Sequence, residues 1–371
     1  MCTNINLKTT NNDIITGRTN EFSGYYNSEI LFLPRHHSIN RFNESFNDEK
    51  IELKYAMIGI NSLNSKRLAI NIGIDTYLDG INEYGLSVSM LFFPEQTKFK
   101  TFANSEIKQN NLSIYLLSTI LLGSCKDVND VKKYLSLNEG DFIYLNQWKE
   151  TFQFHYAITD KTGTSIVIQQ ENNQFVIKNN SLGVLTNQPK LKWHYENIKN
   201  YLSLDKFDHN FSNIKDNIGN LIFDNYLGSG RLGMPGDSSS PSRFIRAIYY
   251  INNLDLSSST EETINNCFKI LSTFNVPKGT EISKINFKNN GSWIESALGP
   301  NYIANQIDNI VVKDLTNQVF YWNDYENLSI RFVDLNNYLE YKTPYSIKIR
   351  DEKTNKFHRA LLSKKQTITQ I

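Results

Sequence analysis

The first residues of the chain carry groups that could do nucleophilic chemistry. Removal of Met1 would leave Cys2 as the N-terminal residue, which would then carry both a thiol and a free α-amino group. Unperturbed pKa values are about 7.7–8.0 for the amine and about 8.5 for the thiol, so a proton can pass between them near neutral pH. The pattern therefore indicates a nucleophile that is activated by its own amine and needs no histidine.

A predicted hairpin positions a positive charge near this cysteine. Alternation from Cys2 to Leu7 predicts a strand with one buried face, and Ile14 to Arg18 predicts a returning strand. The cluster Asn11-Asn12-Asp13 between them is typical of a turn. The hairpin places Arg18 close to Cys2, although such an arginine taken alone also fits a surface residue at a strand end.

The bulk composition predicts a globular protein. The chain has 371 residues, with 40% hydrophobic and 12% aromatic residues, enough to bury a substantial core. Its 39 basic and 38 acidic residues give a net charge of +1, so no overall field favours nucleic acid or an anionic membrane. Small neutral or weakly charged ligands are therefore the expected partners.

The remaining cysteines and the histidines do not suggest a metal site. Cys125 and Cys267 are widely spaced in apolar helical patterns, so we expect two buried thiols and neither a disulfide nor a zinc site. The six histidines show no ligand spacing. We therefore expect no metal and no cofactor.

No apolar run of about 18 residues is present, so no membrane span is expected. No signal peptide is visible either. We expect a cytoplasmic protein if Met1 is the native start, and a periplasmic or secreted one if a leader precedes Cys2.

The order of the predicted elements indicates an α+β protein. Blocks of strands alternate with blocks of helices, which favours antiparallel sheets with helices layered on them over a doubly wound fold. Asp79–Gly85 is predicted as a turn, and Lys342–Ile371 as a solvated terminal helix or frayed tail. The other main predictions are strands at Ile30–Leu33, Ala56–Ile60, Leu68–Ile74, Leu86–Phe93, Gln153–Thr159, Thr164–Gln169, Phe175–Lys178, Leu182–Thr186, Ile310–Val312, Val319–Trp322 and Ser329–Val333, and helices at Leu112–Leu122, Asp127–Leu137, Trp193–Leu202, Ser242–Asn252 and Ser257–Phe274.

Four separated motifs together resemble one family. They are Met1-Cys2-Thr3, Gly17-Arg18-Thr19-Asn20-Glu21-Phe22, Val184-Leu185-Thr186-Asn187-Gln188-Pro189, and Met234-Pro235-Gly236-Asp237 leading into Ser240-Pro241-Ser242-Arg243-Phe244. In this order they resemble the choloylglycine hydrolases, which include bile salt hydrolases and penicillin V acylases and belong to the N-terminal-nucleophile hydrolases. The resemblance implies a four-layer αββα sandwich, with two antiparallel sheets between helical layers. It also implies a single domain over residues 1–371, of which 338–371 could be a peripheral extension, and a homotetramer.

The resemblance implies a role for each matching residue. Cys2 would attack an amide carbonyl, and Arg18 would favour its thiolate. Glu21 stands where the family often has Asp and would hold the α-amino group and Arg18. Asn187 would donate to the oxyanion together with the backbone N–H of Phe92, and Arg243 would complete the charged cluster.

The resemblance implies a small-molecule amide as substrate, and the identity of that amide stays open. The resemblance implies a choloylglycine hydrolase acting on conjugated bile acids, with penicillin V or N-acyl homoserine lactones as alternatives. Asn20 stands where relatives place an apolar residue of the acyl pocket, and Phe92 replaces Asn or Tyr. A polar Asn20 weakens contact with a sterol face, whereas Phe92 favours an aryl or acyl group. A non-catalytic β-rich binding protein is a further alternative.

Overall fold

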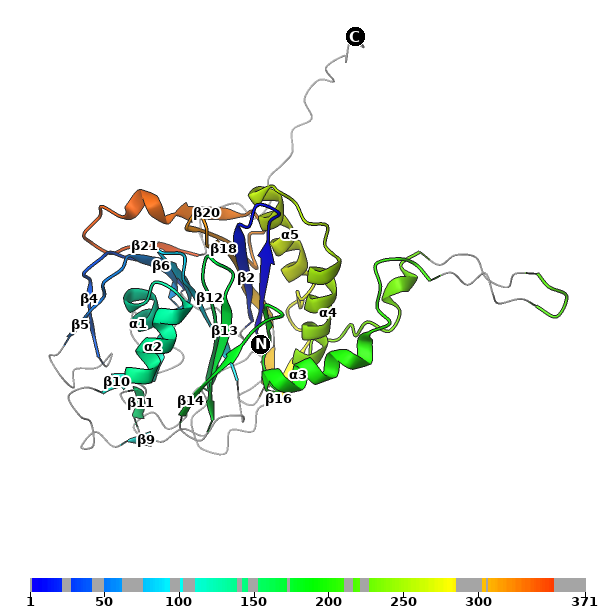
Figure 1. The fold of residues 1–371 in the computed structure, drawn as a ribbon, viewed down its shortest axis with the longest axis horizontal. Helices are drawn as coiled ribbons and strands as arrows, with labels where there is room; N and C mark the ends of the chain where they lie inside the picture. Colours follow the sequence, from blue (N-terminus) through cyan, green and yellow to red (C-terminus); the bar gives the residue numbers. More distant parts are fainter. Residues whose placement is uncertain are drawn as a thin grey trace, which may run out of the picture.

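The computed structural model describes residues 2–21, 28–41, 50–61, 76–93, 101–102, 111–138, 142–145, 153–171, 174–209, 216–220, 227–284, 302–304 and 306–349. Two antiparallel sheets lie face to face, and helices cover the outer face of each (Figure 1). This arrangement is the αββα sandwich that the sequence predicts.

The six-stranded sheet holds the N-terminal hairpin at its centre. Its order is β15-β1-β2-β18-β19-β20, and every pairing in it is antiparallel. The strands are β1 (Cys2–Lys8), β2 (Ile14–Glu21), β15 (Val184–Leu185), β18 (Ile307–Asp314), β19 (Val319–Asp324) and β20 (Arg331–Asp334).

The eight-stranded sheet has the order β14-β13-β12-β8-β7-β6-β3-β21. Its strands are β3 (Glu29–Leu33), β6 (Met57–Asn61), β7 (Tyr77–Asn82), β8 (Ser87–Phe92), β12 (Phe154–Thr159), β13 (Ser165–Glu171), β14 (Gln174–Asn179) and β21 (Tyr345–Lys348). Short pairings outside the two sheets involve β4 (Ser38–Asn40) with β5 (Lys50–Glu52), β9 (Thr101–Phe102) and β10 (Leu112–Ser113) with β11 (Phe142–Leu145), and β16 (Ile282–Lys284) with β17 (Tyr302–Ala304).

Helices α1 (Leu117–Ser124) and α2 (Val128–Asn138) lie on the eight-stranded sheet. Helices α3 (Leu191–Asn197), α4 (Ser240–Asn253) and α5 (Thr260–Ser272) lie on the side of the six-stranded sheet. Single 3-10 turns occur at η2 (Ile114–Leu116), η4 (Ile198–Tyr201), η5 (Ser229–Arg231) and η6 (Leu335–Tyr338).

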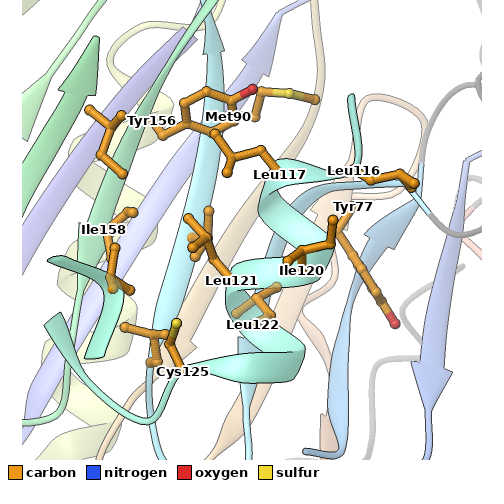
Figure 2. Close-up of a cluster of buried hydrophobic side chains, with 14 of the residues drawn as sticks. Tyr77, Met90, Leu116, Leu117, Ile120, Leu121, Leu122, Cys125, Tyr156 and Ile158 are labelled. Carbon is orange, nitrogen blue, oxygen red and sulfur yellow. The ribbon is translucent and has the colours of Figure 1, made fainter. Parts of the chain in front are cut away.

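An apolar cluster fills the space between α1 and the eight-stranded sheet (Figure 2). Seven of the eight residues of α1 are buried, so the helix is held by packing on nearly all of its surface. In this cluster Leu121 lies on the side of Tyr156 and Ile158 of β12, and Ile120 lies beside Tyr77 of β7 (Figure 2). Burying one such side chain contributes about 1.5–3 kcal/mol, so this layer stabilises the scaffold.

Local chemistry fixes the β1–β2 hairpin. In its turn Asn12 has φ of 73°, a conformation that Asn tolerates better than most residues, and the Thr9 hydroxyl accepts from the Asp13 N–H. Gly17 then lies directly beneath α5, where a Cβ would be 2.4 Å from Cys267 Sγ. Gly17 therefore allows α5 to pack closely, while Arg18 on the opposite face points toward the other sheet.

Helix α4 begins at Ser240, two residues before the predicted Ser242. Ser239 is the N-cap and Pro241 lies in the first turn. The Asp237 carboxylate accepts from the Ser239 N–H and the Ser242 hydroxyl, and these hydrogen bonds lower the pKa of Asp237 to about 2. The helix thus starts at a fixed place, which determines where Arg243 enters the core.

Three predictions of local structure need correction. Asp79–Asn82 lies in β7, and only residues 83–85 form the turn, because Gly80 pairs with Gly59 and admits Leu122 of α1. Within Leu112–Leu122, the first residues form β10 and η2, and α1 begins only at Leu117. In Lys342–Ile371, residues 345–348 form β21, which pairs with β3; residues 350–371 and Leu68–Ile74 lie outside the described residues.

Among the described residues, no helix is long and apolar enough to cross a membrane. The homotetramer stays a prediction. Large apolar side chains are exposed in the described parts of the segment from 202 to 228, at Leu202, Phe207, Ile218 and Leu227.

Candidate active site

The hairpin brings the Cys2 thiol and the Arg18 guanidinium into contact. Cys2 pairs with Asn20 across the two strands, and Arg18 lies two residues before Asn20 on the same face. Arg18 Nη2 donates to Cys2 Sγ at 3.2 Å. Cys2 is only 1% exposed and Arg18 only 2%, so this contact is shielded from water.

The surroundings of Cys2 favour its thiolate. Burial by itself raises the pKa of the thiol, but the charges of Arg18 and of the N-terminal ammonium group, together with the hydrogen bond from Arg18 to Sγ, outweigh burial and hold the pKa below its usual value. Burial instead raises the pKa of Cys125 to about 12 and also raises that of Cys267. Among the three cysteines, the pKa is therefore lowered only for Cys2.

Arg18 is fixed by further partners. Its Nη1 donates to the Leu78 carbonyl at 2.9 Å and lies 3.6 Å from Asp79 Oδ2. Its Nη2 also donates to Asn20 Oδ1 at 3.4 Å. Asn20, which we predicted to line the substrate pocket, is 5% exposed and contacts Arg18; its substrate role stays a prediction.

Asn187 reaches Cys2 from the segment between β15 and α3. Its Oδ1 accepts from the Cys2 backbone nitrogen at 2.9 Å, and its Nδ2 donates to the Phe92 carbonyl at 2.6 Å. Its own backbone N–H donates to Ser240 Oγ at 2.9 Å, which ties the segment to the start of α4. The two predicted oxyanion donors, Asn187 and Phe92, are therefore neighbours.

Arg243 joins these pieces from the first turn of α4. It is fully buried, and its Nη1 donates to the Cys2 carbonyl at 2.6 Å and to Thr3 Oγ1 at 2.5 Å. Its Nη2 donates to Asn187 Oδ1 at 2.6 Å. Because Oδ1 accepts from two donors, the orientation of the Asn187 amide is fixed with Nδ2 on the Phe92 side.

Glu21 lies at the far end of the same cluster. Its Oε1 is 3.7 Å from Arg243 Nη1 and accepts from the Thr19 hydroxyl at 3.1 Å. Thr19 Oγ1 in turn accepts from the Thr3 N–H at 2.9 Å. Glu21 is thus placed beside Arg243, whereas the carboxylate beside Arg18 is that of Asp79.

Two neutral histidines contact the backbone carbonyls of Thr186 and Asn187 next to this cluster. His155 stacks on Phe93 with ring centroids 4.2 Å apart, and its Nε2 donates to the Thr186 carbonyl at 2.8 Å. His194 stacks on Phe244, and its Nε2 lies 3.4 Å from the Asn187 carbonyl. Burial lowers the pKa of His155 to about 3 and that of His194 to about 4, so both rings are uncharged near neutral pH.

Sequence reasoning missed two charged residues of the site. Asp79 was placed in a turn, and Lys313 was not singled out, yet the Lys313 ammonium donates to the Asp79 carboxylate between the sheets. No local pattern could reveal this pair, because its members lie 234 positions apart. Among the described residues, no group of three or more His, Cys, Asp or Glu side chains could hold a metal ion.

This arrangement can perform acyl transfer. A thiol with a lowered pKa lies beside a fixed cation, its own backbone nitrogen is held by Asn187, and the Asn187 amide donates to the Phe92 carbonyl. A carbonyl carbon placed at Sγ would develop negative charge on its oxygen, which the Asn187 amide can stabilise.

Comparisons with known proteins point to the same chemistry. The sequence profile described as "Linear amide C-N hydrolases, choloylglycine hydrolase family" matches residues 2–343. The chain is 25% identical over 340 residues to a "Bile salt hydrolase/transferase" of Clostridium perfringens, covering 91% of this chain and 93% of that protein. It is 31% identical over 284 residues to a "Bile salt hydrolase/transferase" of Lactiplantibacillus plantarum, covering 75% and 80%.

The fold has a solved counterpart. A variant of the conjugated bile acid hydrolase from Clostridium perfringens superposes with a TM-score of 0.74 at 24% identity, covering 97% of this chain and 99% of that one. The likeness establishes the fold independently of the motifs.

Proposed function

We propose, from the premise that the chain belongs to the choloylglycine hydrolase family of linear amide C–N hydrolases, that it uses Cys2 as an N-terminal nucleophile. The observation that carries the proposal is the 3.2 Å contact from Arg18 Nη2 to Cys2 Sγ. A fixed cation stabilises a thiolate, so this contact favours ionisation of the buried Cys2 thiol.

The first half of the reaction forms a thioester. Once Met1 is removed, the α-amino group of Cys2 takes the thiol proton, and Sγ bonds to the amide carbonyl carbon. The oxyanion accepts from Asn187 Nδ2 and from the backbone N–H of Phe92. The C–N bond then breaks, and the leaving amine takes the proton from the α-ammonium group.

The second half releases the acid. The α-amino group accepts a proton from water, the hydroxide oxygen bonds to the thioester carbon, and the S–C bond breaks to regenerate the thiol. The net change is amide plus water to carboxylic acid plus amine. Arg243 holds the Cys2 carbonyl and the Asn187 amide through both halves, and Glu21 offsets its charge.

Conjugated bile acids are the substrates that we propose first. Both curated relatives described above are named for bile salts, and they match most of this chain. Penicillin V and N-acyl homoserine lactones are the alternatives within the family's chemistry. Asn20 and Phe92, two positions where the chain departs from its family, decide among them in this proposal.

The direct test compares wild type with Cys2→Ala and Cys2→Ser. Amine release is followed from glycodeoxycholate, penicillin V and an N-acyl homoserine lactone, after intact-mass measurement has shown that Met1 is absent. We expect wild type to release glycine from glycodeoxycholate and both variants to show only the uncatalysed rate. Turnover by Cys2→Ala would contradict the mechanism, and turnover of penicillin V alone would replace the substrate.

A further inference from the structure

A buried pair of opposite charges lies behind Arg18. Asp79 of β7 and Lys313 of β18 face each other between the two sheets, and they are 1% and 0% exposed. The Lys313 ammonium also donates to Ser89 Oγ at 2.9 Å. Asp79 Oδ2 lies 3.6 Å from Arg18 Nη1, so the pair continues directly into the guanidinium that contacts the thiol.

Stability does not account for this pair. Two charges removed from water cost several kcal/mol each in desolvation, and apolar side chains of similar volume are often at least as stable. The same strands place Ile81 and Val311 in an apolar cluster two positions from Asp79 and Lys313. An apolar layer is therefore feasible here, and the ions need another explanation.

The contacts of Arg18 explain why a buried ion pair lies here. Its Nη1 donates to the Leu78 carbonyl at 2.9 Å and lies 3.6 Å from Asp79 Oδ2, an ion-pair distance, while its Nη2 faces Cys2 Sγ and Asn20 Oδ1. A guanidinium is planar and rigid, so fixing one nitrogen aims the other. Asp79 thus lies where it can set the direction of the donor to the thiol.

An anchor of this kind has an electrostatic disadvantage. A lone carboxylate beside Arg18 would cancel much of the positive charge that favours the thiolate. Lys313 offsets the carboxylate, so the three side chains together carry one positive charge toward Cys2. Burial lowers the pKa of Lys313 while Asp79 opposes that shift, so the two charges depend on each other.

We propose that Asp79 and Lys313 are positioning residues for the reaction: Asp79 aims Arg18 at the thiol, and Lys313 keeps Arg18 from being neutralised. The inference rests on the proposed role of Cys2. Besides Arg18, the N-terminal amine and Glu21 on β2 act on the thiol, and Arg243 on α4 donates to the Cys2 carbonyl. His155 on β12 faces Arg18, and Cys267 on α5 faces Lys313.

The test measures the pKa of the Cys2 thiol directly. The rate of iodoacetamide alkylation is followed against pH, and the modified N-terminal peptide is quantified by mass spectrometry. Lys313→Met is expected to raise the thiol pKa by about one unit, because a positive charge near the thiol is lost. Lys313→Arg keeps the charge and is expected to restore the wild-type value.

A control removes an ion pair elsewhere whose carboxylate is buried and whose arginine is partly exposed. Arg331 Nη2 donates to Asp324 Oδ2 at 2.6 Å at the β19–β20 edge. Arg331→Met is expected to lower the unfolding midpoint without changing the thiol pKa. A shift equal to that of Lys313→Met would overturn the proposal, since the effect would then follow from destabilisation alone.

If Lys313→Met does not fold, a double variant still tests the proposal. Asp79→Asn with Lys313→Met removes the two opposite charges together, so the net charge beside the thiol is unchanged and Arg18 remains as the cation that contacts it. We expect a wild-type thiol pKa but a kcat at least tenfold lower at unchanged KM, because Arg18 has lost its carboxylate anchor. A wild-type kcat in this variant, or a folded Lys313→Met with an unchanged thiol pKa, would refute the inference. An unreactive Cys2 in wild type would instead refute the proposed function.

Discussion

Two buried regions of this molecule differ in their side chains, which are apolar in one and charged in the other. Beneath α1, side chains such as Leu121, Ile120 and Ile158 form an apolar layer that holds the helix on the eight-stranded sheet (Figure 2). Around Cys2, Arg18 and Arg243 are as fully buried, yet they are held by hydrogen bonds and ion pairs. Burial therefore stabilises the packing of α1 in one region and keeps two arginine charges in fixed positions in the other.

The difference shows how the site tolerates buried cations. Each arginine donates to a backbone carbonyl oxygen: Arg18 to that of Leu78, and Arg243 to that of Cys2. A carboxylate lies near each guanidinium, Asp79 at 3.6 Å and Glu21 at 3.7 Å. The apolar layers on either side keep water away, which strengthens these interactions.

The largest effect that separates the two regions is expected for Leu121→Ala. The variant removes a fully buried side chain from the α1 cluster and should lower the free energy of unfolding by about 2–5 kcal/mol. Urea unfolding measures this change. The Cys2 thiol pKa should stay as in wild type, because no charge has moved. A shifted thiol pKa in the folded variant would mean that the regions are coupled.

Asn187→Ala should show the reverse behaviour. Loss of an oxyanion donor lowers kcat by about 10²–10³, which corresponds to about 2.7–4 kcal/mol of transition-state stabilisation. Iodoacetamide alkylation of Cys2 should persist, because the contact with Arg18 remains. Steady-state kinetics with glycodeoxycholate measure the loss, and a decrease of less than tenfold would contradict the role.

Asn187→Asp sharpens that test. The acid keeps an oxygen toward Arg243 Nη2 but replaces the Nδ2 donor, so kcat should fall while the fold retains its link to α4. If only Asn187→Ala lost activity, anchoring of Arg243 and not oxyanion stabilisation would explain the effect.

Local patterns predicted the parts of the site that depend on neighbouring residues. The alternation in Cys2–Leu7 and the turn after it predicted the hairpin that brings Arg18 to the thiol, and the predicted helix Ser242–Asn252 corresponds to α4. Asn187 and Arg243 were identified by family resemblance, because nothing in their own surroundings indicates that they meet Cys2.

Tertiary packing decided what the sequence could not. Asp79-Gly80 is typical of a turn, but Gly80 lies in a strand where Leu122 packs against it. Because Asp79 lies in β7, its carboxylate faces Lys313 and Arg18. This contact forms only when the eight-stranded and six-stranded sheets pack against each other. Such contacts have no short-range signature, which is why this ion pair emerges only from the fold.

The smallest expected effect concerns the neutral histidines that separate the charged cluster from the apolar layers. The folded-state pKa values of His155, about 3, and His194, about 4, lie below the usual value of an unfolded histidine, so unfolding takes up protons in acid. Their contribution to stability is present above about pH 6.5 and is lost as pH falls, with a slope of about 1.4 kcal/mol per pH unit for each ring.

Urea unfolding of wild type, His155→Gln and His194→Gln between about pH 6.5 and pH 5 isolates this slope, because most carboxylates remain ionised there. Each variant should lose about half of the wild-type pH dependence in this range, whatever its stability at pH 7. Equal slopes in all three proteins would mean that the rings accept protons in the folded state. The border between the apolar layers and the charged cluster would then carry positive charge in acid.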